Sequence, residues 1–214
     1  MNNTSDCFIL CLLLSYQCHY QLKRQEPPRP KFGFLPLTLK IMITIFVEEN
    51  NPLTPNFYNN LINSLQFHKL TCTCGHSACL SLHGYYTRSL KTPEGKCTFR
   101  ICRLFCSCCR HTHALLPSSM VPYSQTAMAE HVDIISSHEH RQGWENLMNR
   151  NPCIDESSCR YIIRNFRHHW KQRMLSERIS LADRAALIRD CFAAFSRQFM
   201  QIHRTPNILF MNTT

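Results

Sequence analysis

The first regular pattern of apolar and polar positions begins at a methionine forty-two residues into the chain. Residues 42–47, MITIFV, alternate as a short β-strand does. Residues 54–65 then show helical spacing, and Thr54 followed by Pro55 is a typical helix start, a capping hydroxyl before a proline at the first helical position. Residues 1–41 mix an apolar tract with a proline-rich stretch and sustain no period. This onset indicates that 1–41 is non-native upstream sequence; a disordered or membrane-touching leader is the alternative.

The next segment predicts a β-hairpin and a short third strand. Residues 80–88 and 97–105 read as strands, and KTPEGK at 91–96 reads as a turn because of its proline and glycine. A third apolar strand is expected at 114–116. Cysteines lie just before the first of the two long strands and just after the second.

From residue 126 onward the pattern is helical, and no further strand is expected. A proline-bounded linker at 118–125 precedes it. The predicted helices are 127–136, 145–149, 156–175 with Asp155 as N-cap, and 180–200 with Ser180 as N-cap. The apolar stripe of 180–200 favours core packing, with a homodimer face as the alternative. The tail, 201–214, either docks back or lies free.

Composition adds a strong positive charge to this picture. The 214 residues carry 24 Lys and Arg against 14 Asp and Glu, a formal net charge of +10. The excess is concentrated in 68–116, where seven basic residues face Glu94 alone, and in 141–204. Such a chain favours a polyanionic partner, with nucleic acid first and an acidic membrane surface second; a merely soluble basic surface is the alternative.

Fourteen cysteines are too many for an ordinary core. The apolar run near the N-terminus, 8–16, is too short to span a bilayer as a helix and lacks the basic flank and cleavage site of an export signal. We therefore expect a cytoplasmic protein with reduced thiols, and clustered reduced thiols indicate metal binding. The alternatives are disulfides, which would need an exported protein, and a redox C-x-x-C site, which would need a surrounding βαβ pattern.

The cysteines flank the hairpin as two knuckles. Cys106 and Cys109 form C-x-x-C directly after a strand, and Cys72, Cys74 and Cys79 stand directly before one. Strand pairing brings such knuckles together, as in a zinc ribbon that four ligands from two loops hold shut. We predict one structural Zn²⁺ bound by Cys79, Cys106, Cys109 and either Cys72 or Cys74. His76 is an outside candidate ligand, and Cys108 is a poorly placed spare.

These strings carry a resemblance to a known family. CTCGHSACLSLHGYYTRSLKTPEG and RICRLFCSCCRHTHALLPSSMVPYSQ resemble the bacterial family called domain of unknown function 6431, from about residue 42 to the C-terminus and most densely over 72–125. That family is similar to the zinc-binding regions of transposases and other mobile-element proteins, so the resemblance implies a zinc ribbon and a DNA context. One departure is Arg110, where the family usually has glycine.

The helical half predicts a DNA-binding element. A short helix, a turn and a longer basic helix follow the helix-turn-helix plan, in which the second helix enters the major groove. The alternative is an ordinary amphipathic helix with a solvated basic face. Predicted DNA contacts from the helix and, as phosphate contacts, from the ribbon are Ser157, Arg160, Tyr161, Arg164, Asn165, Arg167, Lys171, Arg88, Arg100 and Arg103.

The sequence shows no recognisable set of catalytic residues. Phosphoryl-transfer chemistry needs grouped carboxylates on strands, whereas the acidic residues here read as helix caps and surface charges. We therefore expect a non-enzymatic zinc and DNA-binding protein, with a zinc-stabilised protein-interaction module as the alternative and a nuclease or transposase as a third. We expect no small-molecule substrate and no membrane partner.

The expected fold class is α+β, a small four-cysteine zinc ribbon followed by an all-α helix-turn-helix-like bundle. The predicted organisation is a leader, a strand–helix lead-in, the ribbon, a linker, the helical domain and a tail, at 1–41, 42–69, 70–117, 118–125, 126–200 and 201–214.

Overall fold

The computed structural model describes residues 41–48, 51–202 and 209–212. All of them belong to one compact unit, Leu39–Thr214. The predicted leader therefore lies outside the described residues, apart from Ile41, which begins the first strand. Among the helices of these ranges, none combines the length and the apolar character needed to cross a bilayer.

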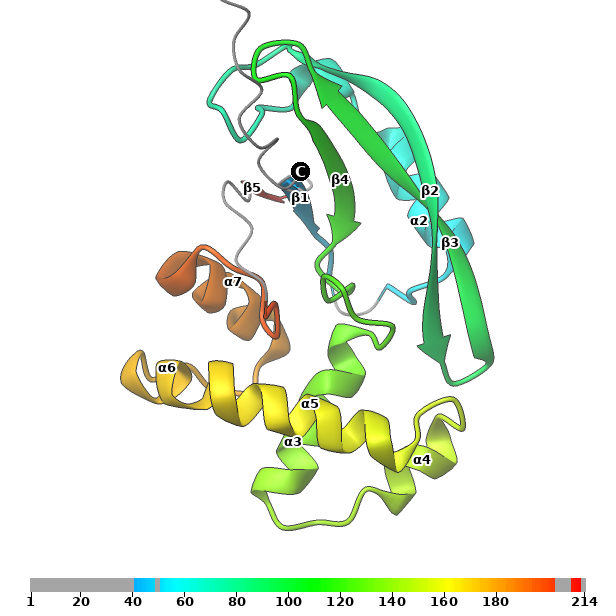
Figure 1. Ribbon diagram of the computed structural model, residues 1–214, viewed down its shortest axis with the longest axis vertical. Coiled ribbons are helices and arrows are strands. Elements are labelled where there is room, and N and C mark those ends of the chain that lie inside the picture. Colours follow the sequence, from blue (N-terminus) through cyan, green and yellow to red (C-terminus); the bar gives the residue numbers. More distant parts are fainter. Residues whose placement is uncertain (1–40, 49–50, 203–208, 213–214) are drawn as a thin grey trace, which may run out of the picture. The chain divides into compact units, whose positions relative to one another are not determined.

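The fold is a mixed α+β structure built on a five-stranded sheet (Figure 1). The order across the sheet is β2-β3-β4-β1-β5. β2, β3 and β4 pair antiparallel, whereas β1 lies parallel to both β4 and β5. The strands are β1 (Ile41–Phe46), β2 (Leu80–Thr92), β3 (Gly95–Cys106), β4 (Thr112–Pro117) and β5 (Leu209–Asn212).

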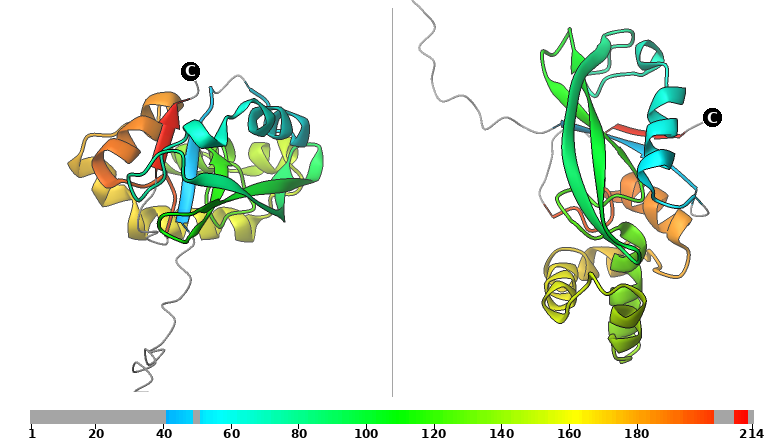
Figure 2. Two further views of the ribbon diagram at one scale, coloured as in Figure 1. Left: turned by 90° about the horizontal axis from the view of Figure 1, so that it is seen from above. Right: turned by 90° about the vertical axis from the view of Figure 1, so that its right-hand side faces the viewer.

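The first four strands confirm the predicted strand positions, but the expectation of no strand after residue 125 is wrong. β5 pairs with β1 at the edge of the sheet, where Figure 2 shows the two side by side. Ile43 pairs with Leu209, so the tail docks back onto a strand more than 160 positions earlier. β1 thus lies between two parallel neighbours. Its residues Ile43, Thr44 and Ile45 are almost completely buried, as is usual for strands inside a parallel arrangement.

The β2–β3 hairpin closes with a two-residue turn, within the predicted turn. Thr92 pairs with Gly95, and the Thr92 hydroxyl donates to the Gly95 carbonyl at 2.9 Å. Gly95 has a φ of +125°, which only glycine adopts readily. At the far end of the hairpin Leu80 pairs with Cys106. This register fixes which side chains of the two flanking loops can meet.

Helix α2 (Pro55–Ser64) covers the hairpin (Figure 2) and begins as predicted, with the Thr54 hydroxyl accepting from the amide of Phe57 at 3.1 Å. Its Tyr58 is buried. The Tyr58 hydroxyl accepts from the Cys102 amide at 2.9 Å and donates to the Leu115 carbonyl at 3.0 Å. It therefore bridges β3 and β4 just beyond their last paired residues. The predicted lead-in is thus part of the sheet's hydrophobic core.

The helices pack around a second hydrophobic core. They are α3 (Met128–Glu139), α4 (Glu145–Arg150), α5 (Glu156–His169), α6 (Lys171–Ser176) and α7 (Arg184–Phe195). A 3-10 turn, η1 (Phe67–Lys69), precedes the first cysteines.

Several helix boundaries differ from expectation, most clearly in the two longest predicted helices. The long helix predicted at 156–175 breaks at Trp170, which leaves helical geometry with φ −124° and ψ −41°. Its buried indole packs edge-on against Phe195 and Phe199, with ring centroids 5.7 and 5.5 Å apart. The last helix begins after Asp183 rather than Ser180, because the Asp183 carboxylate accepts from the Ala186 amide at 2.9 Å.

Buried polar groups join the two cores through the predicted linker, 118–125. The Gln198 side-chain amide donates to the carbonyls of Ser118 and Met120 at 2.6 and 2.9 Å. Arg88 donates to the carbonyls of Val121 and Ser124 at 2.5 and 2.6 Å. Buried carbonyls need such partners, so this segment is a fixed connection between sheet and helices.

His131 holds the same segment from the side of α3. It is 3% exposed; its Nδ1 lies 2.9 Å from the Ala127 carbonyl and its Nε2 lies 3.4 Å from the Ser124 hydroxyl. Burial lowers the pKa of His131 from 6.5 to about 4. The unfolded chain therefore binds a proton that the folded chain refuses as the pH falls from 6.5 to about 4.

We predict that the stability contributed by neutral His131 is present above pH 6.5 and lost as the pH falls toward 4. His131→Gln should flatten the pH dependence of the unfolding free energy by up to about 3 kcal/mol across that window. Denaturant unfolding followed by the helical signal measures this. The control with the same substitution is His168→Gln, at an exposed position of α5. Equal slopes for wild type and His131→Gln would contradict the assignment.

Candidate metal centre

Strand pairing brings the two cysteine loops together at the open end of the β2–β3 hairpin. Cys72, Cys74 and Cys79 lie between η1 and β2, and Cys106 is the last residue of β3. The Ser107 amide donates to the Cys79 carbonyl at 2.9 Å, one residue beyond the Leu80–Cys106 pair. The loops are therefore joined by backbone as well as by thiols.

The first loop folds tightly around its cysteines. The Gly75 amide donates to the Cys72 carbonyl and the Cys72 amide donates to the His76 carbonyl, both at 2.8 Å. Gly75 and Ala78 adopt positive φ values of +88° and +57°. These turns point three thiols of a short segment to one side.

The second loop is a tight turn followed directly by β4. The Arg110 amide donates to the Cys106 carbonyl, and the Cys106 amide donates to the His111 carbonyl, each at 2.9 Å. The Cys109 amide points at the Cys106 sulfur, 3.4 Å away. Arg110 has a φ of +61°, a left-handed conformation that glycine adopts more readily than residues with a side chain.

Six side chains converge between the loops, in two overlapping groups of four. One group is Cys72, Cys74, Cys79 and Cys106, and the other is Cys72, Cys106, Cys109 and His113. Within each group the potential ligand atoms all lie within 4.8 Å of one another. The thiols are thus compatible with a bound metal ion.

The measured spacings suit a tetrahedral ion. Zn–S bonds of about 2.3 Å place sulfurs roughly 3.8 Å apart around a tetrahedron. Cys72 and Cys109 are 3.8 Å apart between sulfurs, as are Cys74 and Cys106. Cys79 and Cys106 lie closer, at 3.4 Å. His113 Nε2 is 3.2 Å from the Cys72 sulfur and 3.8 Å from that of Cys109.

The electrostatics of the cluster are compatible with a bound cation. Burial raises the pKa of the Cys72 thiol, and it raises that of Cys79 to about 12. Burial also acts on Cys106, but hydrogen bonds from the Cys109 amide and neighbouring thiols outweigh it and lower the Cys106 pKa to about 6. Burial lowers the pKa of His113 to about 4, which keeps the imidazole neutral. One thiolate is stabilised by its neighbours, whereas several together need a bound positive charge.

All five cysteines of the predicted zinc site therefore lie together. The sequence analysis missed His113, which is fully buried at the start of β4. The available signal was its place four residues after Cys109, beside the C-x-x-C pair. His76 Nδ1 lies 3.5 Å from the Cys74 sulfur but belongs to neither group, and exposed Cys108 belongs to neither. No cysteine of the described residues forms a disulfide.

Part of the chain matches the model of one known family. Residues 71–151 match the model of the family called domain of unknown function 6431. The match supports the resemblance seen in the sequence, and it spans both cysteine loops, the hairpin, α3 and α4. No curated protein and no solved structure matches the chain.

Two of the predicted DNA contacts, Arg88 and Asn165, do not lie where the prediction requires them. Arg88 is not a free phosphate contact, because its partly buried guanidinium donates to the carbonyls of Val121 and Ser124. Asn165 does not face solvent: it is 8% exposed, on the buried side of α5. Arg103 is half-buried, with its Nε enclosed.

The remaining predicted contacts reach the surface. Arg100 stacks over the ring of Tyr85 at 4.0 Å, and Lys171 pairs with Glu139 at 2.5 Å. Arg160 is exposed and pairs with Glu156 at 2.7 Å. The other exposed members are Ser157, Tyr161, Arg164 and Arg167.

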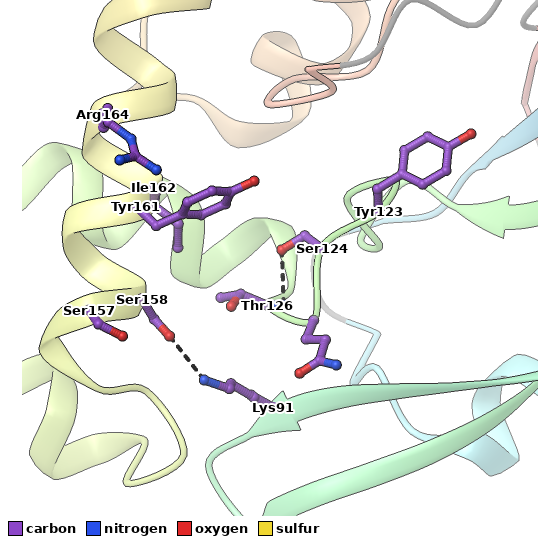
Figure 3. Close-up of a pocket in the computed structure, with 10 residues that line it drawn as sticks. Lys91, Tyr123, Ser124, Thr126, Ser157, Ser158, Tyr161, Ile162 and Arg164 are labelled. Atoms are coloured by element: carbon purple, nitrogen blue, oxygen red, sulfur yellow. Dashed lines mark hydrogen bonds between the residues drawn. The ribbon is translucent and has the colours of Figure 1, made fainter.

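Two surface pockets flank Arg164. The larger, about 440 Å³, lies between the start of α5, the 123–126 loop and the end of β2 (Figure 3). There Lys91 reaches across from β2 and donates to the Ser158 hydroxyl at 2.9 Å. Arg164 and Tyr161 project from the next turn of α5. The smaller pocket, about 300 Å³, also contains Arg160 and Arg167.

We predict that Arg110→Gly raises the free energy of unfolding by about 1 kcal/mol, because glycine removes the cost of a left-handed conformation for a side chain. Denaturant unfolding of the metal-loaded protein measures it. Arg110→Ala is the matched control, since it removes the side chain but keeps the strain. Equal stabilisation by both variants would show that the arginine side chain, and not its φ, is responsible.

Proposed function

We propose that this protein is a zinc-stabilised DNA-binding protein, related to the recognition part of mobile-element transposases and without a catalytic site of its own. The thiol cluster holds Zn²⁺, the sheet fixes the linker at 118–125, and α5 reads DNA from the helical part. The acidic residues support the absence of a catalytic role, because Asp155 and Asp183 cap helices and Asp133 pairs with Arg184.

Zinc fits the donor set better than harder cations do. Thiolate and imidazole ligands suit a borderline-soft ion, and zinc accepts the tetrahedral geometry that the sulfur spacings support. Such a site is structural when protein groups fill all four positions. The sulfur-rich set of this chain leaves no need for water as a ligand, so we assign the ion a structural role.

The exposed cationic face of α5 carries the DNA-binding proposal. Arg160, Arg164 and Arg167 line this face, while Ile162, Ile163 and Phe166 of the same helix are buried in the helical core. Arg164 borders both surface pockets. A helix that is packed on one side and presents arginines beside hollows on the other suits insertion into the major groove, where arginine reads guanine.

The surroundings of α5 support the same use. Its N-terminus is capped by Asp155, whose carboxylate accepts from the Ser158 amide at 2.7 Å. It packs against α3, and the short α4 precedes it across a turn that contains Pro152. This order, a helix, a short second helix, a turn and a longer basic helix, follows the helix-turn-helix plan.

A protein-interaction module is the second candidate function, and the β2 edge favours it. β2 is an outer strand of the sheet and displays Leu82, Tyr85 and Tyr86, which are 49%, 36% and 36% exposed. An exposed edge strand with apolar side chains is a template for pairing with another chain. In this role the protein would work with a separate catalytic subunit.

We predict that the full chain binds duplex DNA with an affinity that falls as salt rises from about 50 to 200 mM. Arg164→Ala should weaken binding by about 1–3 kcal/mol, roughly fivefold to 150-fold, if Arg164 reads a base. Arg164→Lys should recover only the salt-dependent part, because lysine keeps the charge but not the bidentate geometry. Fluorescence titration with a labelled duplex that wild type selects from a randomised pool provides the measurement.

The matched control is Arg189→Ala, which makes the same charge change on exposed α7, outside both pockets. It should leave the affinity close to wild type. If wild type binds no more tightly than about 100 μM, the weak end of non-specific association, the α5 face is only a solvated surface and the protein-interaction candidate replaces DNA binding.

A further inference from the structure

A single tetrahedral ion does not account for the number of ligand atoms in the cluster. Six side chains converge, and an ion with four protein ligands would leave two of them unused. The two leftover groups would lie next to a charged centre. His113 is fully buried, and its Nε2 faces sulfurs at 3.2 and 3.8 Å rather than a carbonyl or hydroxyl.

The six donors divide in a specific way. Both groups of four contain Cys72 and Cys106, and each group then has two members of its own. Cys74 and Cys79 complete one group, and both approach the Cys106 sulfur, at 3.8 and 3.4 Å. Cys109 and His113 complete the other, and both approach the Cys72 sulfur, at 3.8 and 3.2 Å.

We infer that the cluster binds two divalent ions of the zinc type, which share the thiolates of Cys72 and Cys106. One ion has Cys74 and Cys79 as its own ligands, and the other has Cys109 and His113. Each ion then has four ligands, and all six donors are used. The inference deepens the metal-binding part of the proposed function and is independent of DNA binding.

Burial and charge agree with this division. The shared thiols, Cys72 and Cys106, are 1% and 0% exposed, and each ion has one further buried ligand, Cys79 or His113, and one partly exposed ligand, Cys74 or Cys109. Two divalent cations against five thiolates and a neutral imidazole leave a net charge of −1. One ion with four thiolates leaves −2. Binding releases the thiol protons to solvent, and His113 contributes its Nε2 lone pair with its proton on Nδ1.

The two loops contribute equally to the shared arrangement. Three donors come from the segment before β2 and three from β3, its turn and β4. Each ion has two ligands of its own from one loop and one shared thiol from each loop. Each ion therefore has ligands from both loops, so the two ions together join the loops twice.

The test is the number of ions bound by the full chain. Zinc-saturated protein freed of loose metal should contain two ions per chain by elemental analysis and by native mass spectrometry. Reconstitution with ¹¹³Cd²⁺ should give two NMR resonances that couple to each other through the shared sulfurs. Cys7, Cys11 and Cys18 lie outside the described residues, so the count is repeated with all three changed to serine and should stay at two.

Single substitutions assign the ions. Cys74→Ser should reduce the count from two to one and leave the ion that three thiolates and His113 bind. Cys109→Ser should also leave one ion, now in the group with four thiolates. The two residual ¹¹³Cd shifts should therefore differ. Cys108→Ser, an exposed neighbour outside both groups, is the matched control and should retain two ions.

The outcomes separate this inference from the proposed function. One ion in wild type overturns the two-ion cluster and leaves a single structural zinc standing. No bound ion in wild type overturns both. Two uncoupled cadmium resonances overturn the shared thiolates, because the ions then occupy separate sites.

Discussion

Six side chains that could bind a metal ion meet in a largely buried space at one end of the β2–β3 hairpin, and the arrangement of the hairpin depends on that meeting. Their sulfur and nitrogen atoms lie within 4.8 Å of one another in each group. Thiolates this close repel each other, and neutral thiols supply little cohesion to loops made largely of turns. A divalent cation converts the repulsion into attraction. The free energy of such binding, about 10–16 kcal/mol in small zinc modules, is comparable to the stability of a whole domain.

The hairpin carries this constraint to the helical part. At its open end it is held by the cluster, and near its turn Lys91 donates to Ser158 on α5 while Arg88 binds two carbonyls of the linker. Gln198 binds the same linker from the other core. The hairpin therefore contacts both α5 and the linker, and we propose that metal binding would influence DNA binding through these contacts. Arg88, a basic residue predicted to contact phosphate, instead binds the linker between the sheet and the helices.

Local patterns in the sequence predicted most elements because their causes are local. Alternation predicted the hairpin strands, and side-chain caps at Thr54 and Asp155 predicted two helix starts. The misses have non-local causes. β5 exists only because a distant strand, β1, offers it a parallel edge, and Trp170 breaks a helix to reach aromatic rings that follow it by more than twenty positions. Burial of Asn165 likewise depends on packing that helical spacing alone did not resolve.

The cluster of potential metal ligands was easier to predict than the surface proposed to bind DNA, since clustered thiols have few uses besides metal binding and disulfides, and charged residues have many. His113 was nevertheless missed among the twelve histidines. Its spacing of four residues from Cys109 indicates a ligand only when β4 is known to follow the second loop directly. Hydrogen exchange of the full chain before and after metal removal tests most directly whether this centre organises the sheet. Amides of β2, β3 and β4 should lose their protection when metal is removed and regain it on reloading, while amides of α3 and α5, in the separate helical core, keep most of theirs. Unchanged protection of the hairpin without metal would contradict a structural role for the cluster.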